Sequence, residues 1–110
     1  MAKRKVKIPR RDFQTKADFQ TFLDDEKEWM YNRIFEAIKL AHKSKGVEAQ
    51  ILEVGIEESM TVLTMNSFIT DWEETLTLAL KWYEKHEKYE KCSEVLNLIT
   101  EVQNTTTSSI

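Results

Sequence analysis

The imidazole and thiol groups of this 110-residue chain, which are common metal ligands and nucleophiles, are limited to His42, His86 and Cys92. His86 opens the segment His86-Glu-Lys-Tyr-Glu90, which matches the first half of the zincin motif, but Glu90 stands where that motif needs its second histidine. Structural zinc sites use four nitrogen or sulfur ligands, and catalytic zinc sites usually use three protein ligands. The sequence therefore predicts no metal site.

Cys92 falls on an apolar stripe in the last third of the chain. A nucleophilic cysteine needs a nearby base and an exposed, electropositive setting, whereas a free cysteine on an apolar stripe is typically buried. The carboxylates of residues 84–91 alternate with lysines, which is typical of a solvated helix face. We therefore predict that Cys92 packs in the core, and that the protein is not an enzyme and uses no cofactor.

The composition argues against further classes of function. The chain has 2 glycines and 1 proline, so Gly-rich phosphate loops and Rossmann turns are close to excluded. Its single cysteine cannot form an internal disulfide, which favours a reducing compartment. No apolar run approaches the ~18 residues of a membrane span, and the basic N-terminus lacks the apolar region of a signal peptide. These features predict a cytoplasmic protein with no membrane partner.

Charge is distributed unevenly along the chain. The formal net charge is −3, yet the first 11 residues carry six cations and no acid. Residues 46–80 contain seven acids and neither lysine nor arginine. Such asymmetry bears on partners and association rather than on fold. We predict a basic flexible arm over residues 1–14, a single globular domain over 15–103 and a disordered polar tail over 104–110.

Helix signals dominate residues 15–45. Thr15-Lys-Ala-Asp18 resembles a capping box, and Asp24-Asp-Glu26 offers a second N-cap. This pattern predicts either one long helix or a short helix running into a long one, ending near Gly46. The main apolar stripe contains Met30, Ile34, Ala37, Ile38 and Ala41, and the apolar residues beside it are Trp29, Tyr31, Phe35 and Leu40.

The hydrophobic period changes after Gly46. Leu52, Val54 and Ile56 alternate with polar or small residues, and a second β-branched run covers residues 60–65. This alternation predicts a β-hairpin with its turn at residues 57–59. The competing interpretation is a continuous helix through residues 48–65.

Two further helices are predicted in the last third of the chain. Thr70-Asp-Trp-Glu73 is typical of a capping box. One apolar stripe then contains Trp72, Leu76, Ala79, Leu80 and Tyr83, and the next contains Tyr89, Cys92, Val95, Leu96, Ile99 and Val102. Because few residues link the stripes, the two helices should pack as an antiparallel pair. The predicted fold is α+β and mainly helical: long N-terminal helix, β-hairpin and C-terminal antiparallel helix pair. The alternative is an all-α bundle.

The last third also resembles two kinds of helical hairpin. The spacing of small and large residues from Leu76 to Ile99 resembles a tetratricopeptide-type helix pair, and residues 87–96 are similar to the second helix of a UVR-type hairpin. Both kinds bind proteins. The shared pattern indicates a helical hairpin rather than one family, and it transfers no functional residue.

Surplus aromatic and acidic residues suggest a surface for a protein partner. Extra helix faces that bear Trp and Tyr are typical of partner surfaces or self-association. The predicted partner-binding residues are Trp82, Leu78, Glu57, Glu58 and Trp29. The competing interpretation is that the hairpin covers one of these faces. We expect a non-enzymatic interaction module, an adaptor, regulator or accessory subunit, that binds another protein or forms a homo-oligomer.

The alternative function is association with a nucleic acid through the N-terminal arm. Six flexible cations could neutralise phosphates and release counterions. These candidate residues are Lys3, Arg4, Lys5, Lys7, Arg10 and Arg11. A small viral or mobile-element regulator of host machinery would fit this alternative. Deleting residues 2–11 separates the two hypotheses, because only nucleic-acid binding would be lost.

Overall fold

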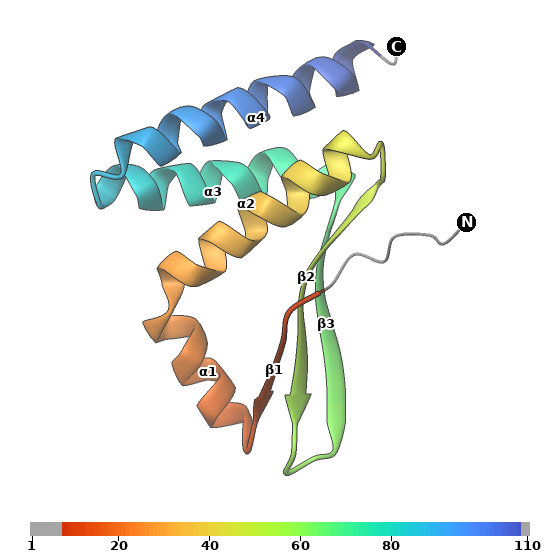
Figure 1. Cartoon of the computed structure of the whole chain (residues 1–110), viewed down its shortest axis with the longest axis vertical. Coiled ribbons are helices and arrows are strands. Elements are labelled where there is room, and N and C mark those ends of the chain that lie inside the picture. Colours follow the sequence, from red (N-terminus) through yellow and green to blue (C-terminus); the bar gives the residue numbers. More distant parts are fainter. Residues whose placement is uncertain (1–7, 109–110) are drawn as a thin grey trace.

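The computed structural model describes the backbone of residues 8–108 and the side chains of residues 8–104. Its elements are β1 (Arg10–Phe13), α1 (Lys16–Asp25), α2 (Lys27–Lys43), β2 (Glu48–Ile56), β3 (Thr61–Phe68), the 3-10 helix η1 (Ile69–Asp71), α3 (Trp72–Lys85) and α4 (Tyr89–Ser108). The described part of the chain thus combines four α-helices with a three-stranded sheet of order β1-β2-β3 (Figure 1). The predicted α+β, mainly helical class is confirmed, and the all-α alternative is wrong.

β1 is the element that the sequence did not predict. It pairs in parallel with the middle strand β2, so that Arg10 lies opposite Glu53. Phe13 packs against Phe19 and Phe22 of α1, with ring centroids 5.3 and 5.2 Å apart. The prediction of a flexible arm over residues 1–14 is therefore wrong for the residues of β1, and residues 1–7 lie outside the described part. A strand this short shows almost no periodicity, and its pairing partner lies about 43 positions later in the sequence.

α1 and α2 realise the second of the two helix predictions, a short helix running into a long one. The Thr15 hydroxyl accepts a hydrogen bond from the Asp18 backbone N–H at 3.1 Å, which is the predicted N-cap. The chain leaves the helical conformation at Glu26, where φ is −111° and ψ is 47°. In Figure 1, α1 lies beside β1 and α2 runs on towards α3. Because the helix breaks at Glu26, α1 lies beside the sheet while α2 continues to α3 and α4.

β2 and β3 form the predicted antiparallel hairpin, so the continuous-helix interpretation of residues 48–65 is wrong. Met60 closes the turn with φ at 52°, in the left-handed region. β2 is the central strand, and Leu52 and Val54 are fully buried beneath the helices. The register shifts between Gln50 and Leu52, which marks a β-bulge.

The side chain of Arg33, on α2, makes hydrogen bonds to the backbone at this bulge. Its Nε and Nη2 atoms donate to the Ile51 carbonyl oxygen at 3.1 and 2.9 Å, and Nη2 also donates to the Gln50 carbonyl at 3.4 Å. Burial lowers the pKa of Arg33, although an arginine remains charged in proteins. The guanidinium therefore donates to the carbonyl oxygens of Ile51, at the register shift, and of its neighbour Gln50.

Arg33→Met is expected to lower the free energy of unfolding by about 1–3 kcal/mol, because it keeps the apolar stem but leaves a part-buried carbonyl unpaired. Urea denaturation followed by circular dichroism measures the loss. Lys43→Met is the matched control, since Lys43 is an exposed cation on the same helix. An equal loss in the control would assign the effect to charge rather than to the bulge.

α3 and α4 pack against each other as the predicted helix pair (Figure 1). The buried residues of α3 are Trp72, Leu76, Ala79 and Tyr83, and those of α4 are Cys92, Val95, Leu98, Ile99 and Val102. The predicted capping box at Thr70 does not form, because Thr70 lies in η1 and the N-cap of α3 is Asp71 without a side-chain hydrogen bond. The backbone of α4 continues to Ser108, so the prediction of a disordered tail is wrong for residues 104–108.

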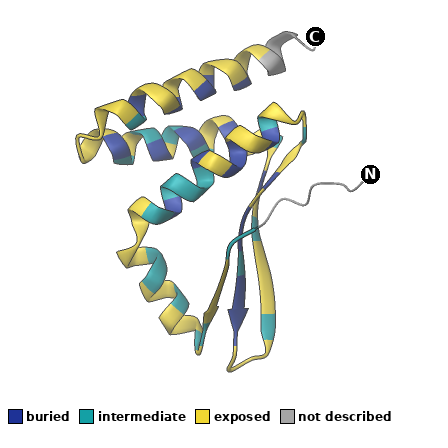
Figure 2. Ribbon diagram, in the orientation of Figure 1, coloured by how far each residue is buried: buried dark blue, intermediate teal, exposed yellow. Residues whose placement is uncertain are grey.

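The apolar stripes predicted for the helices need local corrections. Leu80 and Ile34 are half-buried, whereas Tyr89 and Leu96 are exposed. Two residues outside the predicted stripes, Phe35 and Leu98, are buried instead. Figure 2 shows the buried positions concentrated where the helices meet each other and along β2. Most of β3 remains exposed in the same view.

Candidate functional site

The residues with catalytic or metal-binding chemistry lie apart and have structural contacts. The Nε2 atom of His42 lies 3.7 Å from a Glu101 carboxylate oxygen, and the His86 ring stacks on Trp82 with centroids 4.0 Å apart. Cys92 is buried, as predicted, and burial raises the pKa of its thiol above the ordinary value. Within residues 8–108, no group of three or more His, Cys, Asp or Glu side chains is disposed to hold a metal ion.

The structure does not bring the predicted partner-binding residues together. Glu57 and Glu58 lie at the exposed hairpin turn, at the opposite end of the molecule in Figure 1 from α3 with its Leu78 and Trp82. Leu78 is 55% exposed. Trp29 lies at the start of α2, a third location. The single acidic and aromatic surface inferred from the sequence is therefore divided among separate parts of the molecule.

The two tryptophans of that set are partly covered by other helices. Trp82 stacks on His86 and lies 5.7 Å from the ring of Tyr31 on α2. Trp29 packs edge-on against Phe22 of α1 at 5.6 Å. The aromatic rings in contact with these two tryptophans belong to α1, α2 and the residue that follows α3.

Two of the six cations assigned to the basic arm make contacts inside the domain. Arg10 forms ion pairs with Asp12 at 3.0 Å and with Glu53 at 2.7 Å. The Arg11 guanidinium lies over the Phe22 and Trp29 rings, 5.3 and 4.9 Å from their centroids. The remaining candidates, Lys3, Arg4, Lys5 and Lys7, lie outside the described residues.

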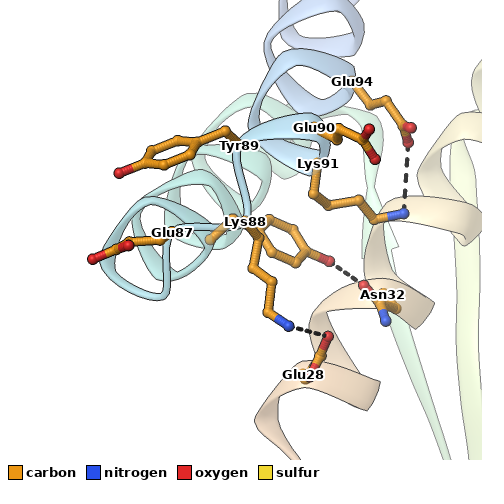
Figure 3. A pocket seen from close by; sticks show the side chains of 9 residues that line it. Glu28, Asn32, Glu87, Lys88, Tyr89, Glu90, Lys91 and Glu94 are labelled. Atoms are coloured by element: carbon orange, nitrogen blue, oxygen red, sulfur yellow. Dashed lines mark hydrogen bonds and ion pairs between the residues drawn. The ribbon is translucent and has the colours of Figure 1, made fainter.

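A polar groove of about 570 Å³ lies between α2 and the beginning of α4 (Figure 3). On its floor the Tyr83 hydroxyl donates to the Asn32 side-chain oxygen, and burial together with nearby glutamates raises the pKa of Tyr83. Lys88 pairs with Glu28 of α2 at 3.2 Å. In Figure 3 both contacts reach α2, at Asn32 and Glu28. The Lys88–Glu28 pair and the Tyr83–Asn32 hydrogen bond therefore join α2 to the C-terminal helix pair across this groove.

The two edges of the sheet differ sharply in chemistry. β1 is a four-residue strand that contains Arg10, Arg11 and Asp12. β3 has eight residues, with sequence Thr-Val-Leu-Thr-Met-Asn-Ser-Phe and no charged residue or proline. Proteins usually protect an edge strand by shortness, charge, proline or a covering element. β1 is protected in this way, whereas β3 is long and uncharged.

β3 also exposes apolar side chains along its length. Val62 is 58% exposed, Leu63 45% and Phe68 53%. Within the described residues β3 pairs only with β2, and in Figure 1 no helix lies along the outer edge of its lower part. The exposed outer face carries Val62, Thr64, Asn66 and Phe68, which alternate with residues that face the helices. This strand, together with the adjacent turn, is the candidate functional site.

The sequence contained part of the evidence that β3 is the candidate site. The absence of lysine and arginine from residues 46–80 was visible as a charge pattern. Strand order was not visible, so nothing in the sequence indicated that the uncharged strand lies at an edge. Comparison with protein-family models, curated proteins and solved structures found no match for this chain. Among the described residues, no helix is both long enough and apolar enough to span a bilayer.

Proposed function

We propose that this protein is a non-catalytic interaction module, acting as an adaptor, regulator or accessory subunit, and that it binds a partner strand along the free edge of β3. The observation that carries the proposal is the contrast between the short, charged edge β1 and the long, uncharged edge β3. An exposed edge of this kind is a template for an added strand.

Strand addition would use both the backbone and the side chains of β3. An added strand gains affinity from main-chain hydrogen bonds and specificity from alternating side chains. Val62 and Phe68 offer apolar contacts on the outer face, and Leu63 offers one on the helix face. The acidic turn residues Glu57 and Glu58 border the beginning of the strand, so part of the acidic surface inferred from the sequence lies next to this edge.

Nucleic-acid association has less support from the described residues. Arg10 and Arg11 contact acidic and aromatic side chains of the domain. Phosphate binding would compete with these contacts. The experiment below nevertheless includes a nuclease arm, which separates the two hypotheses.

A pull-down with the full tagged chain tests the proposal. Lysate from the native cell is divided into nuclease-treated and untreated halves, and bound proteins are quantified by mass spectrometry. Val62→Lys with Thr64→Lys places two charges on the exposed face of β3, as edge-protecting lysines do in other proteins. Ser93→Lys with Asn97→Lys is the matched control, because both positions are exposed on α4.

We expect a stoichiometric protein that survives nuclease treatment, is retained by the α4 control and is lost from the β3 variant. Retention by the β3 variant would contradict the proposal. Loss upon Leu78→Lys, with the β3 variant unaffected, would also contradict it and assign binding to α3. Loss of all partners with nuclease would support the alternative based on the N-terminal cations.

A further inference from the structure

The free edge of β3 is complementary to itself. We propose that the strand added to this edge is β3 of a second copy of the chain, antiparallel and related by a two-fold axis at Thr64, so that two three-stranded sheets become one continuous sheet. This inference rests on the proposed function, because it names the partner for the same edge.

The order of side chains along β3 supports this register. Around a two-fold axis perpendicular to the sheet, residues equally distant from Thr64 lie opposite each other on the same face. Leu63 then lies opposite Met65 of the second copy, both on the helix face. Thr61 lies opposite Ser67, and the two Thr64 residues lie opposite each other. Apolar residues thus meet apolar residues, and hydroxyl groups meet hydroxyl groups.

The ends of the strand extend the same pattern. Phe68, 53% exposed, lies opposite Met60, which is 91% exposed. The remaining pair, Val62 with Asn66, is mixed. Opposite pairs of apolar or threonine side chains stabilise antiparallel strands. Pairing with a second copy would therefore cover four of the exposed apolar side chains at or near this edge: Met60, Val62, Leu63 and Phe68.

Charge allows this pairing at β3 and opposes it at β1. Two copies meeting along β3 place no ionised side chain opposite another, whereas β1 contains three charged residues in four. The net charge of −3 makes the copies repel one another at long range. Salt screens such repulsion. Self-association is therefore expected to strengthen as salt is raised, opposite to the behaviour of a complex with a basic partner.

Sedimentation of the purified full chain tests the inference. Thr64→Glu and Thr64→Lys each place like charges opposite each other at the two-fold axis. We expect each variant alone to raise the dissociation constant of the dimer about tenfold or more, which corresponds to about 1.4 kcal/mol or more. An equimolar mixture of the two variants is expected to associate to within about threefold of the wild-type constant. Circular dichroism melting verifies that both variants are folded.

Each alternative result has a definite meaning. A wild-type chain that remains monomeric at all accessible concentrations overturns the second copy as partner, and leaves the lysate experiment to decide the proposed function. A dimer that Thr64→Glu and Thr64→Lys do not weaken uses another surface and also overturns the inference. If both variants are folded but their equimolar mixture does not associate, the inference is also overturned.

Cross-linking tests the register. Opposite residues of antiparallel strands have Cα atoms about 4.5–5.5 Å apart, within the range that a disulfide spans. Thr64→Cys is therefore expected to form a disulfide-linked dimer under mild oxidation, while the native Cys92 is buried. Val62→Cys alone should not cross-link, but mixed with Asn66→Cys it should. Equal cross-linking by Leu78→Cys, on exposed α3, would indicate random collision and overturn the register.

Discussion

Trp72→Ala is expected to lower the free energy of unfolding by about 3–5 kcal/mol, the range for truncating a buried aromatic side chain to alanine. Trp72 begins α3 and has no exposed surface. Its indole Nε1 donates to the Ser67 carbonyl oxygen at 2.9 Å, so the ring links α3 to the end of β3. Truncation would remove the largest fully buried side chain and leave a buried carbonyl without its donor.

Urea denaturation followed by circular dichroism measures this loss, and two variants separate its causes. Trp72→Phe keeps most of the ring volume but removes the donor, so we expect a smaller loss than for alanine. Leu78→Ala, on the exposed face of the same helix, should change stability by less than about 1 kcal/mol. If Trp72→Ala cost no more than Leu78→Ala, the docking of α3 onto the sheet would be incorrect.

Phe35→Ala is the second large effect, also expected to cost about 3–5 kcal/mol. Phe35 is 2% exposed and lies between α2 and α4. Lys91 of α4 places its ammonium 4.6 Å from the centroid of the ring, and Lys39 lies 5.7 Å from it. The ring therefore packs between α2 and α4, and the ammonium groups of the two lysines lie over it.

Leu40→Ala is the control for Phe35→Ala, because Leu40 lies on the same helix, outside the predicted main stripe, and is 45% exposed. Denaturation midpoints of the two variants should differ clearly, with Leu40→Ala near the wild type. Phe35→Leu, which retains more apolar volume, should fall between Phe35→Ala and the wild type. Equal losses at positions 35 and 40 would contradict the packing of α4 on α2.

Phe35 also shows why the predicted stripes were incomplete. The main stripe of α2 was read as one face, through Met30, Ile38 and Ala41, and those three residues are buried. α2 contacts β2 on one side and the C-terminal helices on another, so it buries a second face that contains Phe35. Periodicity identifies apolar positions on a helix, but the number of neighbours around it decides how many faces are covered.

The aromatic surface assigned from the sequence differs from the structure for a related reason. Trp29 and Trp82 lie off the main stripes, and this position alone suggested exposure. Trp29 instead contacts Phe22 and Arg11, which belong to other elements. Leu78 is the residue of that set on α3 that remains largely exposed. Exposure of an off-stripe aromatic depends on contacts distant in sequence, which local spacing does not contain.

The sequence alone determined the elements that have strong local patterns: the capped helix start at Thr15, the alternating hairpin strands and the two C-terminal helices. These follow from interactions among residues a few positions apart. It also determined the uncharged character of residues 61–68.

Only the tertiary structure decided that Arg10–Phe13 forms a strand, and that it pairs with β2 rather than β3. This pairing makes β2 central and leaves β3 at the edge. The same eight residues in the middle of a sheet would offer no free edge, because both rows of backbone groups would be paired. Strand order arises from contacts between distant segments, and for this reason the sequence could supply the composition of the candidate site but not its availability to a partner.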